Sequence, residues 1–158
     1  MGNAILETND FIQFLIRAKQ NTYAGSGPLT SASRTGSKDL AFAEGNFTYL
    51  DTYLGDIHFI GEEAVWHLGQ PVWGMNYYGR MLVQTIPLGF SECLKEALLQ
   101  VPAEIPFRGP EEYRSGDFSY QCAVEGGLEW FRGKEYIAHK GQRIYQLYFH
   151  GGEIKKAG

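Results

Sequence analysis

Three carboxylate side chains are the groups in this sequence best suited to chemistry: Asp51, Glu63 and Glu135. Glu63 and Glu135 occupy corresponding positions of an internal repeat, and two carboxylates at a defined separation can act as acid and base. Both also adjoin glycine turns, where a solvent-facing glutamate is common, so both interpretations stay open. The repeat places Cys122 where the first half has Asp51, and this asymmetry points to the first half as the functional one.

Asp51 lies in a strand-like run, residues 47–54, in which alternate residues share one face. Its face also carries three aromatic residues: Phe47, Tyr49 and Tyr53. An unpaired acid buried among aromatic rings costs free energy. We therefore expect Asp51 to be paired, to lie at the mouth of a site, or to await a ligand.

The run of residues 71–78 offers a second set of aromatic side chains. One face is large and apolar and is predicted to be core: Trp73, Met75 and Tyr77, with repeat counterparts Tyr145, Leu147 and Phe149. The other face mixes aromatic bodies with polar tips, as pocket walls do: Gly74, Asn76 and Tyr78, with counterparts Gln146, Tyr148 and His150. The predicted ligand-binding residues are Tyr49, Asp51, Tyr53, Glu63, Trp73, Asn76, Tyr78 and Tyr148.

The sequence contains no phosphate-binding loop, zinc-protease helix or nucleophile elbow. His67 and His139 are repeat-equivalent, but no cysteine or third histidine lies at ligand spacing. We therefore predict neither a metal nor a cofactor, and we assign no catalytic residue. For an enzyme of unrecognised type, the acid–base group would come from Glu62, Glu63, Asp51, His67 and Tyr78.

The chain of 158 residues has a formal net charge of −4 and a pI of about 5.6. Proteins that wrap nucleic acid are usually basic, so we expect no direct nucleic-acid binding. The first residues lack the pattern of a signal peptide, and no apolar stretch approaches the roughly 20 residues that span a bilayer. We expect a soluble cytoplasmic protein without a membrane partner, in which Cys93 and Cys122 are free and buried.

Hydrophobic spacing predicts helices at residues 9–20 and 90–101, the first capped by Asn9 or Asp10. The segment 22–38 is rich in Gly and Ser without a period, and a loop of this length is either functional or mobile. Runs of β-type residues between glycines predict eight strands: 39–44, 47–54, 57–67, 71–78, 111–114, 117–125, 128–138 and 142–150.

An internal repeat relates the two β regions. At one constant spacing, Gly45, Phe47 and Gly55 recur as Gly116, Phe118 and Gly126. After one inserted residue, Gly61, Glu63, His67 and Gly69 recur as Gly133, Glu135, His139 and Gly141. We predict an α+β fold made by tandem duplication of a helix plus an antiparallel β-meander, with a pseudo-twofold axis. Residues 1–158 would form a single domain, with repeat one at about 9–80 and repeat two at about 90–152. A cleft between the halves would hold a ligand, and a fully packed seam is the open alternative.

Several runs resemble a bacterial family of uncharacterised domains: YLDTYLGD at 49–56, FIGEE at 59–63, GQPVWGMNYYG at 69–79, RGP at 108–110 and HGG at 150–152. In that family the domain also follows helix-turn-helix DNA-binding domains in transcription regulators. The resemblance implies a bacterial, cytoplasmic and regulatory protein, without an established activity. By architecture alone, the predicted fold is similar to GyrI-like effector-binding domains, which bind aromatic or cationic ligands in a cleft with an acid at its floor.

The leading hypothesis is a non-enzymatic domain that binds or senses a small aromatic or cationic molecule. Asp51 would attract the cation, and aromatic side chains would form the walls. One alternative is a protein-interaction module that recruits a partner, or a second copy as a homodimer, through an exposed edge or aromatic patch. The other alternative is the enzyme of unrecognised type.

Overall fold

The computed structural model describes residues 4–158. A short 3-10 helix, η1 (Ala4–Glu7), precedes helix α1 (Asn9–Gln20), and helix α2 (Phe90–Leu99) separates two groups of strands. The first group is β1 (Lys38–Glu44), β2 (Phe47–Gly55), β3 (His58–His67) and β4 (Gln70–Met81). The second group is β5 (Glu112–Ser115), β6 (Phe118–Gly127), β7 (Trp130–His139) and β8 (Gln142–Glu153). The eight predicted strands are confirmed, with ends shifted by a few residues.

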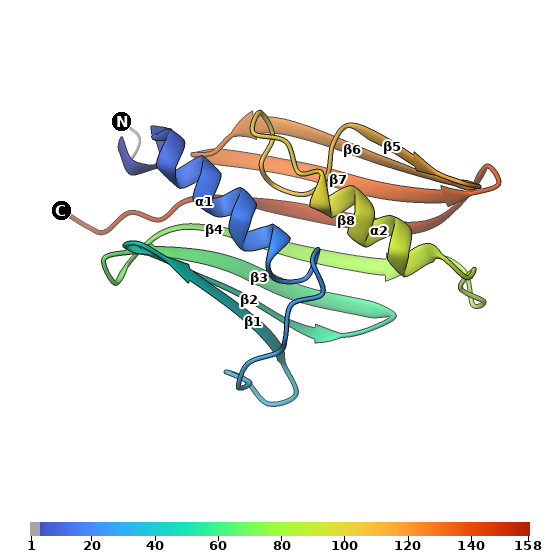
Figure 1. Ribbon diagram of the computed structural model, residues 1–158, viewed down its shortest axis with the longest axis horizontal. Helices are drawn as coiled ribbons and strands as arrows, with labels where there is room; N and C mark the ends of the chain where they lie inside the picture. The colour runs from blue at the N-terminus through green and yellow to red at the C-terminus, as the bar shows by residue number, and fades with distance from the viewer. Residues whose placement is uncertain (1–3) are drawn as a thin grey trace.

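All eight strands form one antiparallel sheet in the order β1-β2-β3-β4-β8-β7-β6-β5. Each group is a meander of sequential strands, and the two meanders join where β4 pairs with β8. At that joint Tyr77 pairs with Phe149, the residue at the corresponding position of the sequence repeat. Figure 1 shows both helices on the same face of the sheet. The predicted α+β class is confirmed, and each half consists of a helix followed by a meander.

Strands β4 and β8 are longer than predicted because they pair with each other. Their ladder runs from the pair Trp73–Glu153 to the pair Met81–Tyr145. In β8 the apolar alternation ends at Phe149, and in β4 Gly79 interrupts it before Met81, so the sequence indicates shorter elements. The added hydrogen bonds come from a partner distant in the chain, which a local pattern does not show.

The two halves also match in their irregular positions. The register shifts at residues 65/66 in the β3–β4 pair and at 137/138 in the β7–β8 pair. The hairpin turns that follow place Leu68 and Lys140 at φ 50° each, directly before a glycine with positive φ. Two consecutive residues with positive φ are typical of a type I′ turn, which matches the twist of the flanking strands. The β3–β4 and β7–β8 hairpins therefore have the same kind of turn at corresponding positions.

The helix ends differ from the sequence prediction. Thr8, rather than Asn9 or Asp10, caps α1, because its Oγ1 accepts a hydrogen bond from the Phe11 backbone N–H at 3.2 Å. Asn9 and Asp10 already lie in the first helical turn, where an acidic side chain is favourable. Helix α2 ends at Leu99 rather than at residue 101.

The core lies between the helices and the sheet and is largely aromatic. Phe107, in the segment after α2, stacks on Phe131 of β7 with ring centroids 4.0 Å apart. Trp73 of β4 stacks on Phe131 at 5.7 Å, and Phe14 of α1 stacks on Phe47 of β2 at 5.0 Å. The predicted core face is confirmed, since its members are all buried: Trp73, Met75, Tyr77, Tyr145, Leu147 and Phe149.

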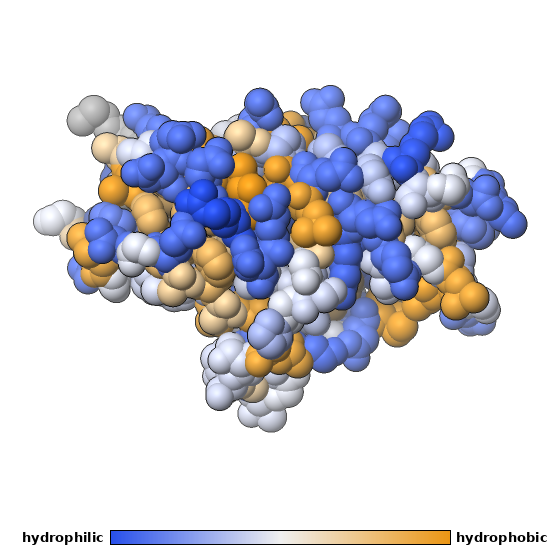
Figure 2. Space-filling view, viewed as in Figure 1, coloured by the Kyte–Doolittle hydropathy of each residue, from blue (hydrophilic) through white to orange (hydrophobic). Residues whose placement is uncertain are grey.

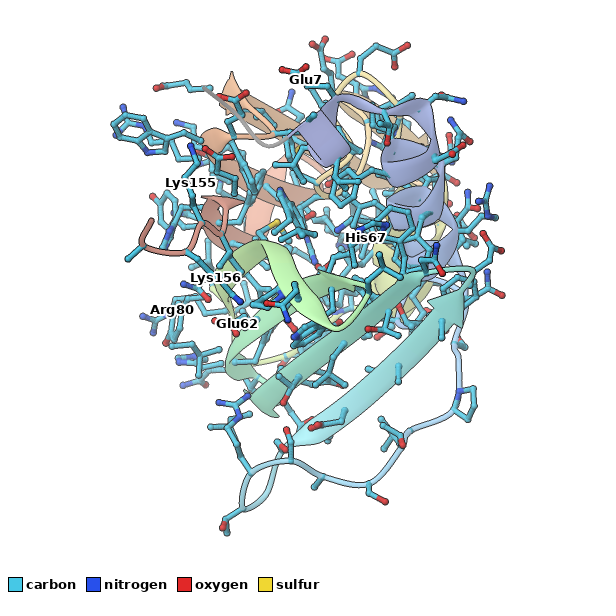
Figure 3. The ribbon with its side chains drawn as sticks, turned by 90° about the vertical axis from the view of Figure 1, so that its left-hand side faces the viewer. Glu7, Glu62, His67, Arg80, Lys155 and Lys156 are labelled. Carbon is cyan, nitrogen blue, oxygen red and sulfur yellow. The ribbon has the colours of Figure 1, made fainter. Side chains whose placement is uncertain are left out.

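Among residues 4–158, no helix lies on the opposite face of the sheet (Figure 1). Tyr78 and Tyr148 lie on it with 41% and 56% of their surface exposed. Figure 3 shows Glu62, Arg80 and Lys155 on this side, across the sheet from α1. On the helix-bearing face, Figure 2 shows hydrophobic residues in patches among hydrophilic ones. The two helices therefore cover the apolar side of the sheet and leave the mixed side open.

Gly133 on β7 lies where a side chain would collide with its neighbours. A methyl group there would lie 2.2 Å from Cζ of Phe149 and 2.7 Å from the Ala123 carbonyl oxygen. Gly133→Ala is expected to lower the free energy of unfolding by about 1–3 kcal/mol, because the buried ring must move. At Gly127 a methyl group would meet nothing within 4 Å, so Gly127→Ala is the control, with a change below about 0.5 kcal/mol. Urea unfolding measures both variants, and equal midpoints would contradict the prediction.

Candidate ligand-binding site

A cavity of about 110 Å³ lies on the helix-bearing side of the sheet. Its wall combines four aromatic side chains with charges of both signs. The lining residues are Tyr23, Asp51, Tyr53, Asp56, Phe59, Tyr77, Leu94 and Arg108. Strands β2, β3 and β4, the β2–β3 turn, helix α2 and the segments after both helices contribute them. We call this space the aromatic cavity.

A smaller space of about 20 Å³, which we call the recess, adjoins the aromatic cavity. The two spaces share Tyr23, Asp51 and Arg108 as lining residues. The side chains that line the recess alone include Lys19, Tyr49, Glu63 and Phe107. A volume of this size holds about one water molecule. The recess is therefore a polar extension of a mainly aromatic space.

Asp51 lies between the recess and the aromatic cavity because strand alternation turns it toward the helices. It shares this side of β2 with Tyr53, as predicted, and is 5% exposed. Its Oδ1 accepts a hydrogen bond from the Tyr77 hydroxyl at 2.5 Å. Burial raises the pKa of Asp51 to about 7, the negative charge of Glu63 adds to the rise, and the Tyr77 hydrogen bond and nearby cations oppose it. The carboxyl group therefore exchanges its proton near neutral pH.

Glu63 lies directly opposite Asp51 in the β2–β3 ladder. Its Oε1 accepts hydrogen bonds from Lys19 Nζ and from the Tyr49 hydroxyl, both at 2.6 Å. Lys19 also donates to the Phe107 carbonyl oxygen at 2.7 Å. Burial lowers the pKa of Lys19, and the charge of Glu63 opposes that shift. Lys19 and Glu63 thus form an ion pair enclosed between α1 and the sheet.

Glu135, the counterpart of Glu63 in the second half, accepts more hydrogen bonds than Glu63 does. Arg108 donates from Nε to Oε1 at 3.0 Å and from Nη2 to Oε2 at 2.7 Å. The hydroxyls of Tyr120 and Tyr145 donate to Oε1 and Oε2 at 2.6 and 2.7 Å. Glu135 is fully buried and Glu63 is 3% exposed. The solvent-facing interpretation of these two glutamates is therefore wrong.

The charges around the two spaces do not balance. When Asp51 is ionised, the buried cluster contains three carboxylates and two cations: Asp51, Glu63, Glu135, Lys19 and Arg108. Lys19 pairs with Glu63 and Arg108 pairs with Glu135, so Asp51 has no cationic partner among residues 4–158. In β6 the corresponding position holds Cys122, which is free and buried, as is Cys93. The unpaired acid belongs to the first half alone.

Four of the predicted ligand-binding residues gather around the two spaces: Tyr49, Asp51, Tyr53 and Glu63. Trp73 lies in the core, where its indole N–H is fully enclosed and has no hydrogen-bond partner within the described chain. Asn76, Tyr78 and Tyr148 lie on the open face, because adjacent residues of a strand point to opposite sides. The structure does not bring these three residues to the cavity.

The five residues proposed as an acid–base group do not converge. Asp51 and Glu63 are neighbours, but Glu62 and Tyr78 face the open side of the sheet. His67 lies at the far end of β3. Within residues 4–158 no three His, Cys, Asp or Glu side chains form a group that could hold a metal ion.

The structure adds cavity residues that the sequence patterns did not indicate: Lys19, Tyr23, Phe59, Tyr77, Leu94 and Arg108. Lys19 offered a usable signal, because it follows Leu15 by one helical turn and continues the apolar face of α1. Tyr23 and Arg108 lie in irregular segments after the helices, where no periodicity shows which way a side chain points.

The architecture defines an α+β protein with an eight-stranded open antiparallel sheet and two helices on one face. The chain belongs to the family described as a domain of unknown function (DUF5680), whose family model matches residues 51–154. This match confirms the resemblance to uncharacterised domains. Comparisons with the curated proteins and with the solved structures find no match. Neither helix in residues 4–158 has the length and apolar character needed to cross a membrane.

Proposed function

We propose that this protein is a non-enzymatic domain that binds or senses a small organic cation beside Asp51. The observation that carries the proposal is a buried carboxylate that lines a cavity without a cationic partner among residues 4–158. Charges buried in proteins are normally paired, because desolvation of a lone charge is costly. A bound cation would supply the missing positive charge.

The walls of the aromatic cavity support the same ligand class. Four aromatic residues line it: Tyr23, Tyr53, Phe59 and Tyr77. Because the face of an aromatic ring attracts cations, such walls favour a cationic ligand over an anionic one.

Removal of the Asp51 charge should weaken cation binding. With benzylamine as the probe at about pH 8, we expect Asp51→Asn to bind at least about tenfold more weakly than wild type, because a hydrogen bond to a charged group is lost. Isothermal titration calorimetry measures the two affinities. Equal affinities, or no binding of benzylamine by wild type, would contradict the proposal.

Asp117→Asn is the matched control for this experiment. Asp117 is exposed in the turn before β6, and the corresponding turn of the first half contains Asn46, so asparagine suits this position. The substitution removes the same charge without touching the cavity. We expect wild-type affinity for benzylamine, and a similar loss in both variants would indicate a long-range charge effect.

We further propose that the two halves arose by tandem duplication. The matching turns and register shifts at repeat-equivalent positions support this origin. We also propose a regulatory, cytoplasmic role in a bacterium, which the family resemblance supports. The net charge of −4 favours a role without direct nucleic-acid contact.

A further inference from the structure

Two carboxylate oxygens beside the recess lack a hydrogen-bond donor. Asp51 uses Oδ1 for the Tyr77 hydroxyl, and Glu63 uses Oε1 for Lys19 and Tyr49. No donor within residues 4–158 reaches Oδ2 of Asp51 or Oε2 of Glu63. The one fully enclosed side-chain polar atom without a partner in that range is an indole nitrogen. Neither carboxylate oxygen is therefore fully enclosed, and both residues line the recess.

The second half shows which donor the first half lacks. There, Tyr145 donates its hydroxyl proton to Oε2 of Glu135. Trp73 occupies the corresponding position in β4, and its N–H makes no hydrogen bond. The donor that the second half supplies from its own chain is therefore missing beside Glu63. A carboxylate that is 97% buried gains from a donor that enters the recess.

The sizes of the two spaces restrict that donor. The recess of about 20 Å³ suits a group the size of one water molecule, such as an ammonium. The aromatic cavity of about 110 Å³ suits a small hydrocarbon body. An apolar cavity of about 150 Å³ binds benzene, so a single aromatic ring is the largest body that this smaller cavity would accept. One ammonium group would also neutralise the surplus negative charge of the buried cluster.

We infer that the ligands are small primary amines whose –NH₃⁺ group enters the recess and donates to Oδ2 of Asp51 and Oε2 of Glu63. The hydrocarbon body, no larger than about a benzyl group, lies among the rings of the aromatic cavity. This inference rests on the proposed function and adds a requirement to it, because positive charge alone is not sufficient. The ligand must also carry N–H donors.

A methylation series tests the requirement on the wild-type protein. Benzylamine, N-methylbenzylamine, N,N-dimethylbenzylamine and benzyltrimethylammonium share one body and one positive charge, but their N–H donors fall from three to none. In calorimetric titrations at about pH 8 we expect affinity to fall along the series by about tenfold to a hundredfold in total. A flat series, or tightest binding of the quaternary cation, overturns the inference and leaves the proposed function standing. If uncharged benzyl alcohol binds as tightly as benzylamine, the proposed function itself fails.

Glu63→Gln tests the second acceptor. The variant should reduce the preference for benzylamine over benzyltrimethylammonium by at least about fivefold, because a neutral amide accepts more weakly than a carboxylate. Glu125→Gln is the control, since Glu125 is 74% exposed on the open face and lines neither space. An unchanged preference in folded Glu63→Gln overturns the role of Glu63. The methylation series is measured with the wild-type protein. The inference can therefore be tested even if the Glu63→Gln variant does not fold.

Discussion

Asp51→Asn is expected to stabilise the ligand-free protein at about pH 8. The pKa of Asp51 is raised from its ordinary value of 3.8 to about 7. Between about pH 4 and about pH 7 the native protein keeps a proton on Asp51 that the unfolded chain has released. The contribution of Asp51 to the free energy of unfolding is therefore full below about pH 4 and is lost as the pH rises to about 7. At about 1.4 kcal/mol per pKa unit, the loss amounts to roughly 4 kcal/mol. Asparagine is neutral at every pH, so the Asp51→Asn variant does not lose this stability.

The pH profile of the difference identifies the cause. Urea unfolding of wild type and Asp51→Asn should show a gain of roughly 2–4 kcal/mol at pH 8 that shrinks toward zero near pH 4. Asp117→Asn, in the exposed turn, should give no such profile. A variant that is less stable than wild type at pH 8 would mean that the Asp51 carboxylate is already well satisfied in the empty protein. Stabilisation by loss of a buried charge is typical of a residue kept for binding.

Arg108→Met is expected to cost about 3–5 kcal/mol of unfolding free energy. Arg108 makes two hydrogen bonds to Glu135, at 3.0 and 2.7 Å, and Glu135 is fully buried. Without the guanidinium, a carboxylate remains enclosed with two tyrosine donors and no counter-charge. Two-state urea unfolding at pH 7 measures the change.

An exposed arginine–glutamate pair in the same half provides the control. Arg132 lies 3.0 Å from Glu125, with 76% and 74% of these side chains exposed. Arg132→Met should cost no more than about 1 kcal/mol, because water solvates the remaining carboxylate. Adding Glu135→Gln to Arg108→Met should recover part of the loss, since it removes the stranded charge. Equal costs at the two arginines would show that burial of the Glu135 pair is irrelevant to stability.

Much of the fold could be predicted from the sequence, because its elements carry strong local signals. Helix α1 spans the predicted residues, and the alternation in β2 correctly groups Tyr49, Asp51 and Tyr53 on one side. The repeat aligned Tyr77 with Phe149, which the structure pairs at the joint of the two meanders. The ends of β4 and β8 were missed, since they depend on each other across the sheet.

The site could be predicted in part, for a different physical reason. Alternation identifies which residues of one strand share a face, but it does not identify what covers that face. Lys19 reaches Glu63 across 44 residues of sequence, and Phe107 across 88. Arg108 approaches from an irregular segment that has no period. The prediction that Asn76 and Tyr78 bind a ligand is based on their mixed aromatic and polar character, which is typical of a pocket wall. The open face of the sheet has the same composition.

The strand order also has a consequence for synthesis on the ribosome. Strand β8 is the last of the eight described strands to be synthesised, and it lies at the centre of the sheet beside β4. Until residues 142–153 emerge, the twelve-residue strand β4 has an unpaired edge, and such edges recruit other chains. A polypeptide chain that is truncated within β7 is therefore expected to aggregate. Completion of the last strand is the step that protects the nascent chain.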